Sequence, residues 1–191
     1  MRSVKTVRWQ RLDILGSERL ELSETDQGRL LTGQVTLGKN DDEANIEYSV
    51  AADKSWITRE VTVYCRQRNT SRTLHVLADG RGTWHQEGRE ITVVRGCLDV
   101  DLAFTPSTNT LPIRRLKLDI GKSARIVAAW LRYPELEWQI LEQEYERLSE
   151  DFYEYRSRRG AFVAKLKVDE MGLVREYPGI WKSVKGESPK R

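Results

Sequence analysis

Apolar and polar residues alternate with a period of two along much of the first half of the chain. From Trp56 to Cys65 the odd-numbered positions are mostly apolar and the even-numbered positions polar, the pattern of a half-buried strand. Turn-forming residues separate this run from others like it. Short strands at regular spacing favour a curled antiparallel sheet over βαβ units. The further strands predicted here are Val4–Asp13, Glu18–Glu24, Arg29–Leu37, Ala44–Ala52, Thr73–Leu77, Thr83–Gln86 and Ile91–Val94.

Arg59 interrupts the apolar face of the run from Trp56 to Cys65. A guanidinium on such a face needs an acidic or polar partner, or it marks the mouth of a cavity. Alternatively, its aliphatic stem packs against the sheet while its head reaches solvent. Both interpretations stay open, and Arg59 is kept as a candidate ligand-binding residue.

The second half of the chain has a more mixed pattern. Helical spacing of apolar residues between Leu136 and Glu150 predicts a helix, and Arg125–Tyr133 fits either a central strand or a helix that ends at Pro134. The turn-forming segment Asp169–Gly172 predicts a hairpin. Strands are predicted by alternation at Ile113–Ile120, Phe152–Arg156, Ala161–Val168 and Leu173–Tyr177.

The segment from Gly96 to Leu116 differs in residue mix from its surroundings. Two aspartates alternate with apolar residues, so in an extended chain their carboxylates point to one face. A polar loop between Pro106 and Pro112 follows, and two arginines come directly after it. The prolines restrict the backbone and predict an ordered loop. The candidate site residues in this central block are Asp99, Asp101, Thr108, Asn109, Thr110, Arg114 and Arg115.

The central block allows several kinds of chemistry. Its acids can serve as an acid–base pair, as ligands of a hard metal ion, or as counter-ions of the arginines in an ionic network that holds the loop. Arginine forks also suit phosphate, sulfate or carboxylate groups, and the loop hydroxyl and amide groups suit a sugar. The tryptophans and the Tyr153/Tyr155 pair can line an apolar channel or fill a core.

Composition excludes several classes of protein. With 191 residues, of which 39% are hydrophobic and 32% charged, the chain fits one globular domain, predicted at residues 1–184 and followed by a polar basic tail at 185–191. A net charge of +3 gives no sign of the basic patch of a nucleic-acid binder.

The segment Val50–Glu60 is echoed by Lys167–Glu176, which raises the option of two similar β halves, about 1–95 and 96–184.

Familiar catalytic, cofactor and targeting motifs are absent from the sequence. The chain lacks a nucleophile elbow, a phosphate-binding loop and a dinucleotide fingerprint, and its two histidines and two cysteines do not have zinc-site spacing. We therefore predict no cofactor and no metal.

Cys65 and Cys97 are expected to be buried, reduced thiols. No secretory leader or membrane span is evident, which predicts a cytoplasmic protein, while the oligomeric state is not indicated.

Several segments resemble a bacterial family named for glycolipid binding, a domain-of-unknown-function group. The resemblance rests on Asp99–Leu102, Thr108–Leu116 and Val168–Val174, together with Asp53–Arg59 and Tyr177–Trp181, and covers about Val7 to Trp181. It implies an all-β spiral β-roll with little helix, similar in shape to bacterial lipid and lipoprotein carriers. It also implies a strand in the first half of 136–150, with Leu136, Trp138 and Ile140 on one face, while residues 141–150 stay open between helix and strand.

Pattern and resemblance together give one leading hypothesis and one main alternative, beside a third possibility, a protein-interaction module that presents an exposed sheet edge. The first is a non-catalytic binding or carrier protein for an amphiphilic ligand such as a glycolipid or acyl compound, held at the central block with Arg59. The alternative is an enzyme acting on a small anionic or sugar-containing substrate at Asp99, Asp101, Arg114 and Arg115. An open cleft with an acid beside an unpaired arginine would favour the enzyme, and buried, mutually paired charges would favour a structural role.

Overall fold

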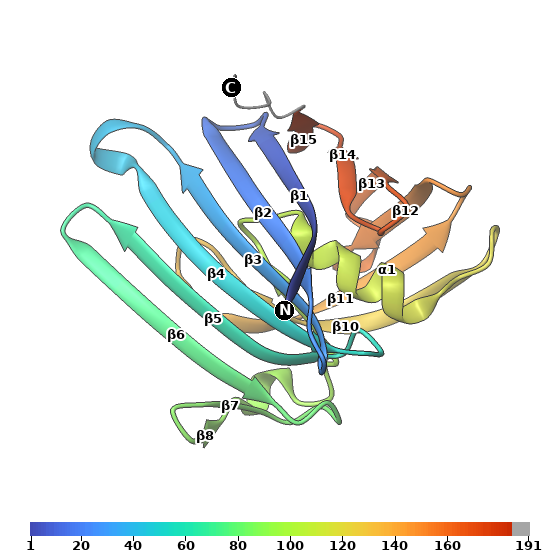
Figure 1. The fold of residues 1–191 in the computed structure, drawn as a ribbon, viewed down its shortest axis with the longest axis horizontal. Helices are drawn as coiled ribbons and strands as arrows, with labels where there is room; N and C mark the ends of the chain where they lie inside the picture. Colours follow the sequence, from blue (N-terminus) through green and yellow to red (C-terminus); the bar gives the residue numbers. More distant parts are fainter. Residues whose placement is uncertain (185–191) are drawn as a thin grey trace.

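The protein folds into one strongly curled sheet (Figure 1). The computed structural model describes residues 1–184, apart from the side chains of Asp41 and Arg158, so the predicted basic tail at 185–191 lies outside the described residues. Within this range the sheet has fifteen strands in the order β8-β7-β6-β5-β4-β3-β2-β1-β15-β14-β13-β12-β11-β10-β9. The strands are β1 (Arg2–Arg11), β2 (Gly16–Glu24), β3 (Gly28–Leu37), β4 (Ala44–Asp53), β5 (Thr58–Gln67), β6 (Thr70–Ala78), β7 (Trp84–Gln86), β8 (Arg89–Glu90), β9 (Asp99–Leu102), β10 (Ser123–Leu131), β11 (Trp138–Arg147), β12 (Phe152–Ser157), β13 (Phe162–Val168), β14 (Val174–Tyr177) and β15 (Trp181–Val184). The predicted all-β, curled antiparallel fold is confirmed.

The order of the strands explains why the sheet curls. The chain begins in the middle of the sheet, runs outward through antiparallel hairpins to β8, and then crosses to β9 at the opposite edge. Strands β10 to β15 lead back to β1, and among the strands within residues 1–184 only the β9–β10 pair is parallel. The two edges are joined by the short segment 91–98, so the sheet must bend until they lie near each other. The Trp84 indole donates to the Cys97 carbonyl at 2.8 Å, and the Thr58 amide donates to the Leu98 carbonyl at 3.1 Å. These bonds hold segment 91–98 against the N-terminal strands, although β8 and β9 do not pair with each other.

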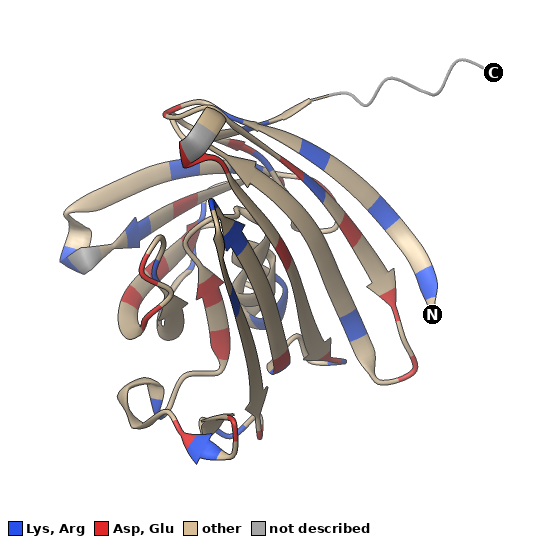
Figure 2. Cartoon of the chain, turned by 90° about the vertical axis from the view of Figure 1, so that its left-hand side faces the viewer, with Lys and Arg blue, Asp and Glu red and all other residues tan. Residues whose placement is uncertain are grey.

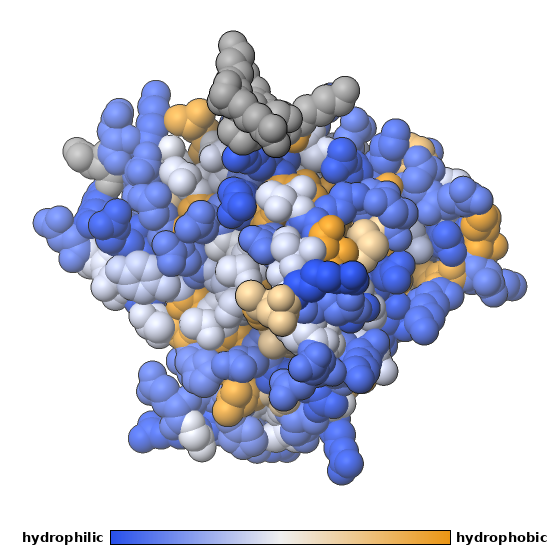
Figure 3. Space-filling model, in the orientation of Figure 1, coloured by the Kyte–Doolittle hydropathy of each residue, from blue (hydrophilic) through white to orange (hydrophobic). Residues whose placement is uncertain are grey.

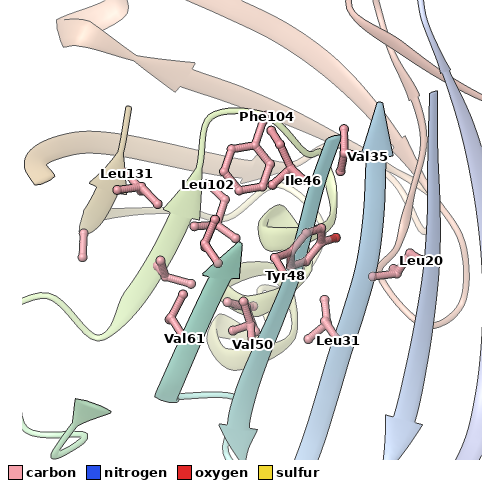
Figure 4. Close-up of a cluster of buried hydrophobic side chains, with 14 of the residues drawn as sticks. Leu20, Leu31, Val35, Ile46, Tyr48, Val50, Val61, Leu102, Phe104 and Leu131 are labelled. Atoms are coloured by element: carbon pink, nitrogen blue, oxygen red, sulfur yellow. The ribbon is translucent and has the colours of Figure 1, made fainter. Parts of the chain in front are cut away.

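The inward face of β1 to β6 carries the larger of two hydrophobic clusters (Figure 4). Leu20, Leu31, Val50 and Val63 are all fully buried on this face, as period-two alternation predicts. The second cluster lies under β11 to β14, where the Tyr145 and Tyr155 rings pack with centroids 5.1 Å apart. We refer to β1–β8 as the N-terminal arm and to β9–β15 as the C-terminal arm.

Two predicted strands are helical instead. Thr110–Leu116 forms the helix α1, so the strand predicted at Ile113–Ile120 is wrong. Its inner residues Leu111 and Ile113 are buried between the two arms, and this tertiary burial selects a helix where the local pattern alternates. The strand predicted at Ile91–Val94 is also wrong, because Thr92–Val94 forms a 3₁₀ turn at the junction between the sheet edges.

Two segments with an ambiguous pattern are strands. Ser123–Leu131 is β10, and Trp138–Arg147 is β11, which confirms the strand implied by the family resemblance and overturns the helix predicted by spacing. Leu141, Gln143 and Tyr145 point inward from β11 while the intervening glutamates point outward. Leu136 is buried, Trp138 is half-buried and Ile140 is exposed, so the shared face predicted for these three residues is wrong. Leu136 lies before β11 with a φ of 52°, so the alternation of the strand does not extend to it.

A β-bulge corrects the prediction for Arg59. Ala51 pairs with Glu60 and Ala52 pairs with Thr58, so Arg59 is an extra residue between two ladder positions. The bulge turns Thr58 into the core and Arg59 out to the surface. There the guanidinium forms an ion pair with Asp53 at 2.9 Å and donates to the carbonyl of Asp79.

The predicted echo between Val50–Glu60 and Lys167–Glu176 corresponds to a shared turn. The Oδ1 atom of Asp53 accepts hydrogen bonds from the amides two and four residues further on, at 2.8 and 3.1 Å. Asp169 does the same at 3.0 Å, and Asp79 does so at 2.7 and 2.9 Å. The turn therefore recurs in three places, and the division into two similar halves stays a prediction.

Candidate functional site

The central block lies inside the roll. Every residue from Phe104 to Ile113 is buried, and α1 sits on the inner side of the curled sheet (Figure 1). Phe104 packs between Tyr48 and Tyr133, with ring centroids 5.8 and 6.2 Å away. The proline-framed loop is therefore ordered, as predicted, because it fills the inside of the sheet.

The polar atoms of the loop are hydrogen-bonded within the protein. The Thr108 hydroxyl accepts from the Leu102 amide at 3.3 Å, and the Thr110 hydroxyl donates to the Gly172 carbonyl at 3.1 Å. The Asn109 side chain accepts from the Tyr145 hydroxyl at 2.9 Å. These bonds tie the block to the C-terminal arm. A sugar contact by these three residues stays a prediction that would require them to be uncovered.

A buried acid near the block escaped the sequence reasoning. The Glu18 Oε1 atom accepts hydrogen bonds from Tyr48 at 2.5 Å and Thr105 at 2.7 Å, and Tyr48 is also bonded to Ser107 at 2.6 Å. Burial raises the pKa of Glu18 to about 8, because a charged carboxylate is costly away from water. Its Oε2 atom is buried without a hydrogen-bond partner. The signal was available, since alternation along β2 places Glu18 on the same face as Leu20.

Asp99 and Arg115 form the ion pair that the central block predicted. The Arg115 Nη2 atom lies 2.6 Å from Asp99 Oδ2, and Nε lies 3.0 Å from Oδ1, the bidentate geometry of a strong pair. Only 1% of the Asp99 side chain is exposed, against 18% for Arg115. Burial raises the pKa of Asp99, and the hydrogen bonds from Arg115 oppose that rise. The Arg115 side chain thus reaches solvent at the edge of the block, and its guanidinium is held in place by the buried Asp99 carboxylate.

Asp101 has an amide partner instead of an arginine. The Gln143 Nε2 atom donates to Asp101 Oδ2 at 2.5 Å, and burial raises the pKa of Asp101 to about 6. Gln143 in turn accepts from the Tyr145 hydroxyl at 3.4 Å. Both acids of the block are thus engaged in pairs, the arrangement expected of a structural role rather than of an acid–base pair beside an unpaired arginine.

Arg114 points away from its neighbour Arg115, because successive side chains of an α-helix diverge by about 100°. Its guanidinium carbon lies 5.6 Å from the centre of the Trp56 ring, and Nη1 donates to the Glu170 carbonyl at 3.4 Å. Its buried Nε atom has no hydrogen-bond partner. The structure therefore separates the two arginines that the sequence presents as a pair.

An open groove of about 940 Å³ lies beside Arg115 on the C-terminal arm. Leu98, Ile126 and Val127 give it an apolar wall, and Arg115 and Gln143 bring polar groups into it. Arg125 and Arg156 form ion pairs with Glu144 at 3.6 and 3.9 Å. The remaining lining residues are Gly96, Glu142, Ser157, Arg159 and Gly160.

Two other hollows are smaller and lack this combination. One of about 640 Å³ between the β3–β4 and β5–β6 turns is lined by polar residues alone. Another of about 500 Å³ is lined by Arg59, Arg29, Asp53 and Leu30 among others, at the turns that follow β2 and β4. Arg59 therefore lines a different hollow from Arg115. The predicted site residues are divided among the filled interior, this hollow and the groove.

The two cysteines are not joined by a disulfide. Cys65 and Cys97 are free and buried, as predicted. Among the described residues, no cluster of three or more His, Cys, Asp or Glu side chains is placed to hold a metal ion. In the same part of the chain, no helix has the length and apolar character needed to cross a membrane.

Comparison with known proteins extends the resemblance seen in the sequence. The family described as "Putative glycolipid-binding" matches residues 6–183. The crystal structure of a DUF1089 family protein from Pseudomonas aeruginosa is 34% identical in sequence and superposes with a TM-score of 0.79, covering 95% of this chain and 94% of that one. No curated protein matches the chain.

Proposed function

Because the chain belongs to the family described as glycolipid-binding, we propose that it binds an amphiphilic ligand such as a glycolipid without transforming it, and that the groove beside Arg115 is the site. The observation that supports this most directly is the composition of the groove. It joins an apolar wall to a guanidinium that is 18% exposed and held by a bidentate pair with Asp99, which suits a ligand with one apolar and one polar end.

The groove has a size that fits this role. At about 940 Å³ it lies near the upper end of the roughly 300–1,000 Å³ range of ligand sites in proteins. An acyl chain would lie against Leu98, Ile126 and Val127, and the head group would contact Arg115 and Gln143. Asp99 and Asp101 would act indirectly, because they hold those two polar side chains in place.

The interior of the N-terminal arm is unsuited to the same ligand, since the central block already occupies it. We therefore assign Thr108, Asn109 and Thr110 a scaffolding role and the groove the binding role. The cytoplasm is the compartment we propose, since both cysteines are free thiols.

Binding can be tested with an alkyl glycoside that is soluble as a monomer. Delipidated protein would be titrated with dodecyl maltoside below its micelle concentration, in competition with a fluorescent fatty-acyl probe. Val127→Trp, which fills the groove, should weaken binding by about tenfold or more. Leu77→Trp, at an exposed position on β6 outside the groove, is the matched control and should bind as the wild type does.

The outcomes separate the function from its location. If neither probe binds, and native mass spectrometry after mild extraction finds no bound amphiphile, the proposed function is wrong. If both bind but Val127→Trp leaves the affinity unchanged, the ligand site lies elsewhere.

A further inference from the structure

The tip of the β1–β2 hairpin carries the densest group of exposed aliphatic side chains in the described part of the chain. Leu12, Ile14 and Leu15 are 52%, 46% and 59% exposed within four consecutive residues, whereas the other large exposed apolar side chains are dispersed. Figure 3 shows hydrophobic side chains at the top of the molecule, near the tips of β1 and β2. We propose that this tip, residues 12–15, inserts into the interface of an anionic lipid bilayer.

The tip is held in a fixed shape. The Leu12 amide donates to the Ile180 carbonyl at 2.9 Å, and the Gly38 amide donates to the Leu15 carbonyl at 2.7 Å. Arg11 and Asp13 form an ion pair at 2.7 Å beside it. Because its backbone is bonded to turns on both sides, the tip cannot fold its apolar side chains inward, and their exposure is a built feature.

Basic side chains lie close to the tip on β1, β2 and the neighbouring strand β15. Arg8 and Arg19 are both exposed and lie directly opposite each other across β1 and β2. Like charges in such a pair destabilise a sheet unless something else neutralises them. Lys182 on β15 is exposed next to Gln10, with its acidic partner Glu176 only at 3.9 Å. Figure 2 shows Lys and Arg at intervals along β1, the strand that starts at the N label.

Two acids near the tip already have cationic partners. Asp13 is paired with Arg11, and Asp42 on the next hairpin is paired with Arg68. Glu18 is buried, and its raised pKa favours the neutral form. The tip thus combines an apolar end with three basic side chains next to it, Arg8, Arg19 and Lys182, which we call the cationic collar. An interfacial segment buries its apolar part by about 5–10 Å, which would bring the collar to the level of the phosphates.

Vesicle sedimentation tests this proposal on the full chain. The vesicles would be phosphatidylcholine alone, or phosphatidylcholine with 30 mol% phosphatidylglycerol (~7:3, a strongly anionic surface). We expect the wild type to partition onto the anionic vesicles, and the triple variant Leu12→Ser, Ile14→Ser, Leu15→Ser to lose about tenfold or more. Arg8→Gln with Arg19→Gln should lose several-fold and bind with a weaker dependence on salt.

A matched control removes the same amount of exposed apolar surface elsewhere. Leu77→Ser, Ile140→Ser and Val163→Ser lie on three other strands, have similar exposure and should leave partitioning unchanged. Circular dichroism and melting temperature would establish that both triple variants fold. Titration with dodecyl maltoside should give the wild-type affinity for the tip variant, so failure of docking and failure of ligand binding are distinguishable.

Three results would overturn the proposal. The first is a wild type that does not partition onto anionic vesicles. The second is a tip variant that partitions as well as the control. The third is a wild-type oligomer that the tip variant turns into a monomer, because the tip would then serve contact between copies of the chain.

Discussion

The two arms of the roll meet the central block in different ways. On the N-terminal arm, the inward side chains of β2 to β5 form one buried cluster with Leu102 and Phe104, both of which are fully buried (Figure 4). On the C-terminal arm, β10 to β12 stand apart from Arg115 and leave a groove. One segment therefore completes a core on one side and borders an open site on the other. Changes on the filled side should affect stability, and changes on the open side should affect binding.

The largest effect is expected for Phe104→Ala. The ring is fully buried between Tyr48 and Tyr133, so its removal leaves a cavity that the surrounding strands cannot close. We expect a loss of about 4 kcal/mol in the free energy of unfolding, measured by chemical denaturation. A loss below about 1 kcal/mol would mean that the block does not fill this arm tightly.

Arg115→Leu should have the next largest effect, because it leaves the Asp99 carboxylate buried without its partner. A loss of about 3 kcal/mol is expected, and adding Asp99→Asn should restore part of it. Denaturation of the single and double variants measures both numbers. Additive losses would show that the two side chains do not act as a pair.

Glu18→Gln should have an effect that depends on pH. The folded-state pKa of Glu18, about 8, lies above its ordinary value of 4.5, so the folded protein binds the extra proton between these two values. Wild-type stability should therefore fall as pH rises from about 4.5 to 8, and the variant should lack this part of the fall. The melting temperature of the variant should thus rise relative to that of the wild type as pH increases. In terms of the free energy of unfolding, we expect the variant to gain on the order of 2 kcal/mol relative to the wild type by pH 8. A difference that does not change with pH would show that Glu18 ionises normally.

Val127→Ser should have the smallest effect on stability. The side chain lines the groove and is 38% exposed, so its removal leaves no closed cavity. We expect a change within about 0.5 kcal/mol, measured under the same conditions as for Phe104→Ala. A loss comparable to that of the phenylalanine variant would mean that the two arms are equally filled.

The fold was largely predictable because its strands alternate regularly. The pattern along Ala161–Val168 corresponds to β13, whose even-numbered residues face the core. Period-two counting fails where tertiary structure changes the count. The bulge at Arg59 shifts the inward face by one residue, and α1 is a seven-residue helix that packing selects inside the sheet.

The candidate site was predictable only in part. Proximity in sequence correctly suggested that Asp99 and Arg115 pair, but it also placed Arg114 with them, which the helix turns toward Trp56. The groove could not be predicted from the sequence, because it is formed by Leu98 and residues of β10, β11 and β12. The distances between these residues depend on how far the sheet curls. Glu18 was within reach, as an acid on an otherwise apolar strand face.

The pairing of β1 with β15 has a consequence for the order in which the molecule is made. Arg8 lies opposite Val184, so the middle of the sheet is assembled from the two ends of the chain. Such distant contacts form slowly, because a long loop must close before they are gained. During synthesis on the ribosome, β1 would keep one edge unpaired until the last strand emerges. Completion of the roll therefore waits until β15 has been synthesised.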